Sequence, residues 1–392
     1  MLTQSQRALV KATVPLLEQS GEALARHFYR IMLTDYPEVR PLFNQAHQAS
    51  GAQPRALANG VLAYARHLDR LDALGPLVTR IINKHVTLQV LPEHYPIVGT
   101  CLLQAMRDVL GPDVATDEVM DAWAAAYDRL AKLLITAEEE IYAAHAAAEG
   151  GWRGARRFVL SRRVVESEEI TSFYLRPEDG GPTMAFLPGQ YIGLKLNLDG
   201  QEMRRNYSLS APGNGRDYRI SVKREPGGRV SGYLHERFAV GDALELFPPA
   251  GEFVLRPGER PLALITAGVG ITPALTLLEA ALPSGRPIHF IHCARHGGVH
   301  GFRDWVDALA ARHPQVRRYY CYSEPRPGDR ADAYGFLERD LLAQWLPRPS
   351  ETEAYFLGPT PFMAMVRRHL RALGVPEARC HHEFFGPADA LA

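Results

Sequence analysis

The hydrophobic period of this sequence changes near residue 150, and that change constrains the fold more than any other feature. Before Gly150-Gly151 the apolar residues recur at steps of three and four, which is typical of amphipathic helices. After it they alternate, as in 191–198, where the even positions are apolar, and alternation favours strands. At about 150 residues per domain, a chain of 392 residues is expected to contain two or three domains.

The first module is predicted to be all-α and to cover residues 1–148. One apolar stripe passes through Leu57, Val61 and Tyr64, and a longer one follows the predicted last helix, at about 117–146. Proline residues and a Gly-Pro pair separate the expected helices.

Two further modules follow, each with its own pattern. Short alternating segments separated by Gly and Pro predict an antiparallel β-barrel or sandwich over 152–257. Over 258–392, buried strands such as 262–266 and 288–291 are each followed by turns and helical stretches. This alternation predicts an α/β domain with a parallel sheet and crossover helices.

Composition excludes several classes of function. The chain has 44 basic and 44 acidic residues, so it lacks the basic surface expected of a nucleic-acid-binding protein. Its four cysteines are widely spaced, which argues against a zinc site or a disulfide framework and suits the reducing cytoplasm. There is no signal-peptide hydrophobic region and no apolar stretch of about 18 residues, so we expect a cytoplasmic protein that is not inserted in a membrane.

A glycine-rich turn joins a predicted strand to a predicted helix in the third module. Gly268, Val269 and Gly270 would let the backbone approach a pyrophosphate, and the following helix, with Ile271 and Thr272, would offer free N–H groups. The third glycine of the usual dinucleotide motif is absent, and Pro273 stands in its place. Taken alone, the motif is weak, and a tight strand-to-helix turn without a ligand is the alternative.

Three more motifs accompany this turn in a fixed order. The second module contains Arg205-Asn206-Tyr207-Ser208 and then Gly227-Gly228-Arg229-Val230-Ser231, and the chain ends with Glu383-Phe384-Phe385-Gly386-Pro387. Over residues 152–387 this set resembles the ferredoxin reductase-like flavoproteins. In that family a barrel holds FAD and an α/β domain holds NADH or NADPH.

The resemblance implies a role for each motif residue. Tyr207 would stack on the isoalloxazine, and Ser208 would hydrogen-bond its reactive nitrogen. Tyr191 and Phe385 would pack against the flavin, while the segment from Gly268 to Pro273 would hold the nicotinamide dinucleotide. The remaining cofactor-binding residues of the resemblance are Arg205, Asn206, Gly228, Val230, Ser231, Phe384, Gly386 and Pro387.

Two positions depart from the family pattern. Relatives often have Cys-Gly-Pro where this chain has Leu357-Gly358-Pro359, and often have cysteine where Phe384 stands. Neither thiol binds a cofactor covalently, so we expect an altered rate of hydride transfer rather than its loss.

The first module also carries a recognisable residue order. Tyr29, Gln53, His85, Tyr95 and Glu138 follow one another across about 145 predicted helical residues. This order, with the reductase-like modules behind it, resembles the flavohaemoglobin (nitric oxide dioxygenase) family over the whole chain. The resemblance implies that His85 binds the iron of haem b, with Glu138 and Tyr95 behind it. Tyr29 would stabilise bound O2 with help from Gln53.

Other interpretations of these residues remain open. Glu138 begins a run of three glutamates, and a charge run is usually a solvated helix face. His94 is a rival iron ligand, although it follows a proline near a helix start. By resemblance, Lys84 and Glu383 would tune electron transfer between flavin and haem.

The family implies a monomeric enzyme that detoxifies nitric oxide. Electrons from NADH or NADPH would pass through FAD to the haem, where nitric oxide and O2 become nitrate. A lipid or another apolar ligand could also occupy the distal pocket, beside Leu57. The alternatives are an O2 carrier, a haem-based gas sensor, and a ferric or flavin reductase with the globin as its sensor.

Overall fold

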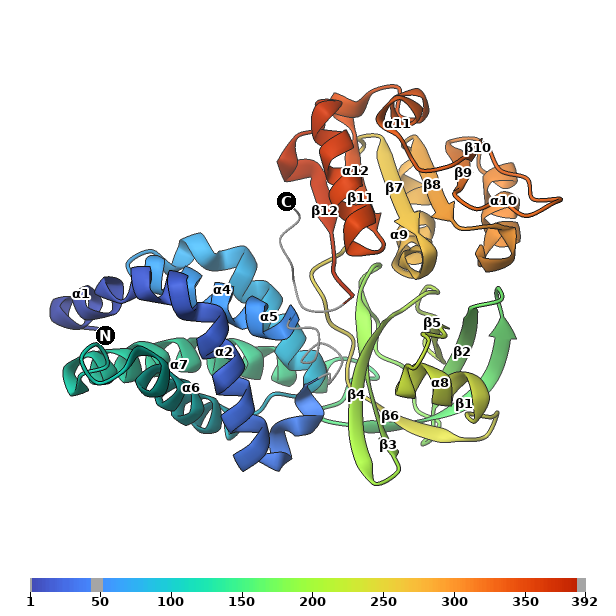
Figure 1. The fold of residues 1–392 in the computed structure, drawn as a ribbon. Helices are drawn as coiled ribbons and strands as arrows, with labels where there is room; N and C mark the ends of the chain where they lie inside the picture. The colour runs from blue at the N-terminus through green and yellow to red at the C-terminus, as the bar shows by residue number, and fades with distance from the viewer. Residues whose placement is uncertain (1, 44–51, 386–392) are drawn as a thin grey trace.

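The computed structural model describes residues 2–43 and 52–385. It has a helical module on one side and two sheet-containing modules stacked on the other (Figure 1). The predicted fold class is confirmed, because an all-α module is followed by an antiparallel β module and then by a parallel α/β module.

The helical module packs around a core that contains Phe28, Met32 and Trp123. Helix α2 crosses both α4 and α6, and the long α7 ends at residue 147, within one residue of its predicted end. The Thr116 side chain caps α7 by accepting a hydrogen bond from the Val119 N–H, at 3.4 Å. The helices are α1 (Gln4–Ala12), α2 (Val14–Asp35), α4 (Ala52–Arg66), α5 (Gly75–Leu88), α6 (His94–Leu110) and α7 (Asp117–Ala147).

The second module is a six-stranded antiparallel sheet in the order β4-β3-β6-β1-β2-β5. A bridge between Leu209 and Ile220 joins the end of β4 to β5, so the sheet curls into a barrel. Its interior is filled by aromatic and aliphatic side chains, among them Phe158 and Tyr218. The elements are β1 (Arg156–Val165), β2 (Ile170–Pro177), β3 (Tyr191–Leu198), β4 (Gln201–Ser208), β5 (Tyr218–Lys223), α8 (Arg229–Glu236) and β6 (Ala243–Leu246).

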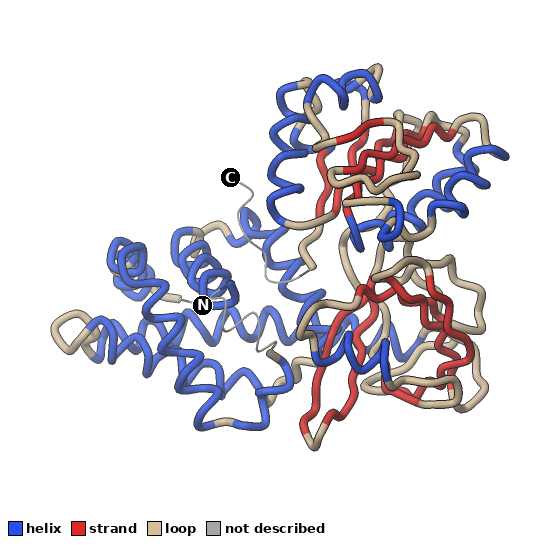
Figure 2. Tube along the Cα trace, turned by 45° about the vertical axis from the view of Figure 1, so that its right-hand side comes forward, coloured by secondary structure: helices blue, strands red, loops and turns tan. Residues whose placement is uncertain are grey.

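The third module is a parallel sheet with helices on both faces, as Figure 2 shows for the strands and their covering helices. Helices α9 and α10 cover one face, and α11 and α12 cover the other. The elements are β7 (Leu262–Ala267), α9 (Ile271–Ala281), β8 (Ile288–Ala294), α10 (Arg303–Arg312), β9 (Val316–Tyr322), β10 (Ala333–Tyr334), α11 (Arg339–Trp345), β11 (Glu353–Leu357), α12 (Thr360–Ala372) and β12 (Cys380–His382).

The strand order of this sheet, β10-β9-β8-β7-β11-β12, fixes the location of its ligand crevice. Strand β7 has β8 on one side and β11 on the other, so the connections diverge at its carboxyl end. In open α/β sheets, ligands bind in the crevice at such a switch point. The glycine-rich turn predicted from the sequence lies there.

Within the described residues, no helix is both long and apolar enough to cross a membrane.

Candidate active site

Three side chains from three helices of the globin-like module meet at hydrogen-bonding distance. His85 comes from α5, Tyr95 from the first turn of α6 and Glu138 from α7. Nδ1 of His85 lies 2.7 Å from Oε1 of Glu138 and 3.1 Å from the Tyr95 hydroxyl. The Tyr95 hydroxyl donates to the same carboxylate oxygen at 2.7 Å. The structure therefore brings together the residues that the sequence placed behind the iron.

Burial gives this cluster its chemical character. Glu138 is 2% exposed and Tyr95 is 6% exposed, so the carboxylate is shielded from water. Desolvation raises the pKa of Tyr95 well above its usual value, and the nearby Glu138 charge raises it further, so the hydroxyl keeps its proton. A carboxylate only accepts hydrogen bonds, so this geometry suits a His85 ring that donates from Nδ1.

The position of Glu138 was readable from helical spacing. Leu134, Glu138 and Tyr142 stand four residues apart and are all buried, whereas Glu139 is exposed and paired with Arg153 at 2.6 Å. Only the first glutamate of the run thus lies on the inner face of α7. The solvated-face interpretation is correct for its neighbour and wrong for Glu138.

The residues expected on the other side of the pocket are partly described. Tyr29, on α2, is 7% exposed, and its ring makes edge contacts with Phe28 and Phe43 at centroid distances of 4.9 and 5.5 Å. Leu57, on α4, packs against the same apolar core. The side chain of Gln53 lies outside the described residues.

The rival histidine has a different environment. His94 is at the start of α6, and its Nδ1 accepts a hydrogen bond from the Leu91 N–H at 2.9 Å. Burial lowers the pKa of His94 below its ordinary value. Unlike His85, it makes no hydrogen bond to a carboxylate within the described residues, although the charges of Glu93 and Glu38 act on it.

Helix α5 also contacts the barrel, through Thr87, a residue that the sequence analysis missed. Its Oγ1 accepts a hydrogen bond from Nδ2 of Asn206 at 3.1 Å, and its side chain lies close enough to Tyr191 to limit the rise that desolvation causes in the pKa of that tyrosine. Gly193 leaves room for the Thr87 carbonyl, because a Cβ at Gly193 would overlap that oxygen. Two residues predicted to serve the flavin therefore contact a residue only two positions from His85.

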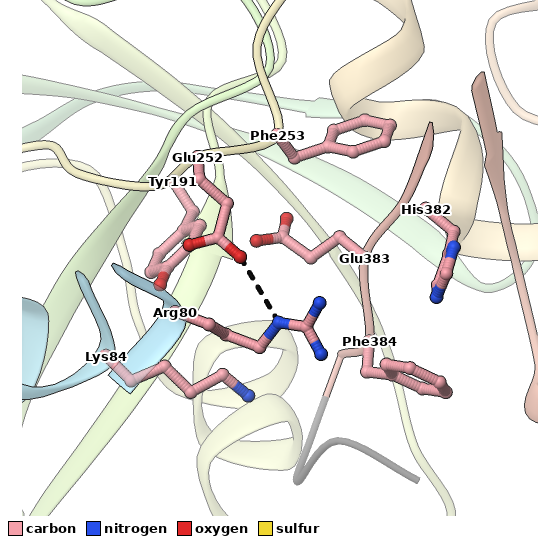
Figure 3. A pocket seen from close by; sticks show the side chains of 8 residues that line it. All are labelled: Arg80, Lys84, Tyr191, Glu252, Phe253, His382, Glu383 and Phe384. Carbon is pink, nitrogen blue, oxygen red and sulfur yellow. Dashed lines mark hydrogen bonds and ion pairs between the residues drawn. The ribbon is translucent and has the colours of Figure 1, made fainter. Parts of the chain in front are cut away.

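A second set of contacts encloses a small pocket at the junction of the three modules. Arg80 pairs with Glu252 at 3.2 Å, and Asn83 accepts a hydrogen bond from the Gly251 N–H at 3.0 Å. Figure 3 shows the Glu252 and Glu383 carboxyl groups turned toward one another above the Arg80 and Lys84 side chains.

The environment of this pocket shifts the pKa values of Glu383 and Lys84, the two residues predicted to tune electron transfer. Desolvation raises the pKa of Glu383 to about 8, and the nearby Lys84 limits that rise. Desolvation lowers the pKa of Lys84, opposed mainly by Glu383. Lys84 and Glu383 therefore interact electrostatically, and each favours the charged form of the other.

The predicted flavin residues of the barrel lie along β3, β4 and the start of α8. Tyr191 pairs with Ser208 across the two strands, and desolvation raises the pKa of Tyr207 above its usual range. Arg205 is partly buried, and desolvation lowers its pKa.

The glycine turn before α8 opens onto a surface cavity of about 520 Å³. Gly228 is the residue before the helix, and Val230 and Ser231 are buried in its first turn. The Ser231 hydroxyl donates to the Gly228 carbonyl at 3.3 Å and accepts from the Glu225 N–H at 3.2 Å. The Ser231 hydroxyl therefore stabilises the turn.

The dinucleotide turn has the geometry that its glycines suggested. Gly268 has φ +54°, a conformation that side chains rarely adopt, and Gly270 lies where a Cβ would be 2.5 Å from the Leu357 carbonyl oxygen. Val269 accepts a hydrogen bond from Thr272 at 3.0 Å. Ile271 and Pro273 are buried in the first turn of α9.

The C-terminal motif is only partly described. Phe384 lines the three-module pocket and contacts the His382 ring edge-on at 5.5 Å, while Phe385 is 48% exposed. Gly386 and Pro387 lie outside the described residues.

These features define a class of protein: a haem-binding globin joined to a flavin- and nicotinamide-binding reductase. Residues 26–134 match the globin family, 157–255 the oxidoreductase FAD-binding domain and 264–368 the oxidoreductase NAD-binding domain. The chain is 70% identical to the flavohemoprotein of Pseudomonas aeruginosa and 65% identical to that of Pseudomonas putida, with full coverage of each chain.

A solved structure has the same three-module fold. The flavohemoglobin of Malassezia yamatoensis, with bound FAD and haem, superposes with a TM-score of 0.88 at 26% identity, covering 98% of this chain and all of that one. The chain belongs to the flavohemoprotein family. Its cofactors are haem, FAD and a nicotinamide dinucleotide, and it transfers electrons from NADH or NADPH to the haem.

Proposed function

We propose that this protein is a nitric oxide dioxygenase, which converts nitric oxide and O2 to nitrate and so detoxifies nitric oxide. The observation that carries the proposal is the buried His85–Glu138–Tyr95 cluster. A carboxylate that accepts the Nδ1 proton makes the imidazole a stronger electron donor, which favours O2 activation over simple storage. A fused reductase also suits turnover better than reversible gas binding.

Each residue then has a defined task. His85 would hold the haem iron through Nε2, while Glu138 and Tyr95 fix the orientation and tautomer of its ring. Bound haem would supply the site where the two gases react. Tyr29, buried near Phe28 and Phe43, would direct its hydroxyl toward the gas-binding side.

The reductase residues would deliver the electrons one at a time. Tyr191, Arg205, Tyr207 and Ser208 would hold FAD in the barrel domain, proposed to span 152–257. The turn from Gly268 to Pro273 would hold the dinucleotide in the last domain, 258–392, and the globin domain would span 1–148. A flavin accepts a hydride and releases single electrons, which suits its place between the two.

The Vibrio cholerae protein described as a nitric oxide dioxygenase supports this proposal. Its flavohaem-like FAD/NAD-binding domain is 37% identical over 60% of this chain and all of that one, with a TM-score of 0.56.

The test is nitric oxide consumption by protein loaded with haem and FAD, with O2 and NADH, and with nitrate measured. We expect rapid loss of nitric oxide matched by nitrate, abolished in His85→Ala and retained in the matched variant His94→Ala. No nitrate from protein whose haem is reduced by NADH would refute the dioxygenase and favour a reductase or sensor. Activity that survives His85→Ala would show that the reaction does not take place at a haem bound by His85.

A further inference from the structure

The residue after the second strand of a dinucleotide-binding sheet discriminates between the two nicotinamide cofactors. An acidic residue there binds the adenosine 2′-hydroxyl of NADH, whereas an arginine accommodates the 2′-phosphate of NADPH. In this sheet the second strand is β8, which ends at Ala294, and the next residue is Arg295. Arg295 could therefore meet a 2′-phosphate, but a single arginine is weak evidence and does not decide between the two cofactors.

The structure shows that this arginine already has an anionic partner. The Arg295 guanidinium forms an ion pair with Glu169, from the loop between β1 and β2 of the barrel. A second pair lies beside it, between Arg326, which follows β9, and Glu168 at 2.6 Å. Both pairs join the flavin-binding module to the nicotinamide-binding module, and we call this group of four side chains the clasp.

The backbone fixes the clasp in place. The Glu168 N–H donates to the Gly298 carbonyl at 2.9 Å, and the Arg224 N–H donates to the Glu169 carbonyl at 2.8 Å. A Cβ on Gly298 would overlap the Glu168 carboxylate, so this glycine permits the close approach of the two loops. The glutamates are therefore held over the end of β8 rather than placed there by chance contact.

The local charge does not favour another anion. A third carboxylate, Asp329, lies beside Arg326 and His296, and the backbone N–H groups of Arg326 and Gly297 lower its pKa. Three carboxylates thus surround two guanidinium groups, and a 2′-phosphate would add about two more negative charges.

We propose that Glu169, supported by Glu168, is a specificity-determining residue that makes NADH the preferred donor. Its carboxylate occupies the Arg295 guanidinium that would otherwise bind a 2′-phosphate. It also provides, from the barrel, the acidic group that β8 lacks, and that group accepts a hydrogen bond from the 2′-hydroxyl of NADH. Because Arg295 is 50% exposed, the pair is weak enough to be competed by salt.

The test is equilibrium binding to the haem- and FAD-loaded protein by calorimetry, with adenosine 5′-monophosphate and adenosine 2′,5′-bisphosphate as probes. We expect the wild type to bind the monophosphate more tightly. Glu169→Gln should tighten bisphosphate binding by roughly fivefold, the factor for about 1 kcal/mol of surface ion pairing, and should not improve binding of the monophosphate. Adding Arg295→Ala to that variant should cancel the gain.

The matched control is Glu178→Gln, which breaks a similar ion pair with Arg157 at 2.7 Å on another part of the barrel. It should leave both affinities unchanged. The proposal is overturned if the wild type prefers the bisphosphate, or if Glu169→Gln and Glu178→Gln behave alike. Neither nitric oxide nor the haem takes part in this binding, so its result is independent of the dioxygenase proposal.

Discussion

Replacing Glu138 by glutamine tests the chemistry assigned to the histidine cluster. The substitution keeps the shape of the side chain but removes the charge that His85 and Tyr95 both contact, at 2.7 Å each. A hydrogen bond to a charged group contributes about 1.5–3 kcal/mol, against about 0.5–1.5 for a neutral one. The His85 bond should therefore weaken by about 1–1.5 kcal/mol.

The weaker His85 hydrogen bond should destabilise mainly the oxidised haem, because the more positive iron gains more from a strongly donating imidazole. One electron transferred across 1.4 kcal/mol corresponds to about 59 mV. We therefore expect the haem reduction potential of Glu138→Gln to rise by roughly 40–60 mV. Because both donors contact Oε1, the glutamine carbonyl can take its place and keep both hydrogen bonds. The buried amide N–H group at the position of Oε2 should lower the free energy of unfolding by about 1–3 kcal/mol if it finds no acceptor.

The assay is a spectroelectrochemical titration of the haem absorption band, with Glu139→Gln as the matched control. Glu139 is the next residue on α7, but it is exposed and pairs with Arg153. Its substitution should leave the haem potential unchanged. Equal potentials in wild type and Glu138→Gln, with haem content intact, would refute the electron-donating role assigned to the carboxylate.

Three more substitutions probe other parts of the architecture. Thr87→Val removes the acceptor for Asn206 and should slow flavin-to-haem electron transfer in stopped-flow spectra; an unchanged rate would show that this contact does not align the modules. Gly270→Ala should lower the free energy of unfolding by about 1–3 kcal/mol through overpacking, whereas Gly60→Ala, where a Cβ meets nothing within 4 Å, should not. His292 is fully buried, and desolvation lowers its pKa to about 3, so the unfolded chain binds its proton first. Stability should fall by up to about 1.4 kcal/mol per pH unit as pH drops from 6.5 toward 3, and His292→Gln should flatten that slope in denaturant titrations.

Much of the fold was predictable because it depends on local periodicity. The apolar spacing of α7 gave its end to within one residue, and the strand–glycine–helix pattern identified the turn at Gly268. The motif order identified the reductase for the same reason, since each motif is a contiguous segment. Local patterns carry this information because hydrogen bonding and side-chain period are set within a few residues.

The contacts between modules were not predictable in this way. Arg80 and Glu252 are 172 residues apart, and Thr87 and Asn206 are 119 apart, so no window of sequence contains both members of a pair. The contact made by Arg295 was unpredictable for the same reason, because its partner Glu169 is 126 residues away. The residue alone does not decide between NADH and NADPH, and the proposal of NADH depends on a tertiary contact with Glu169.

Helix α5 joins the two redox modules more firmly than the clasp joins the reductase domains. Nδ1 of His85 faces Glu138 in the globin core, while Thr87, two residues later, contacts the barrel through a buried side chain. The haem-side histidine and the flavin-side residues are therefore fixed by one rigid element. The clasp, by contrast, consists of exposed ion pairs, which contribute little stability and separate readily. This difference suits the chemistry, because electrons must cross a fixed distance between flavin and haem, whereas the dinucleotide must enter and leave its crevice in every turnover.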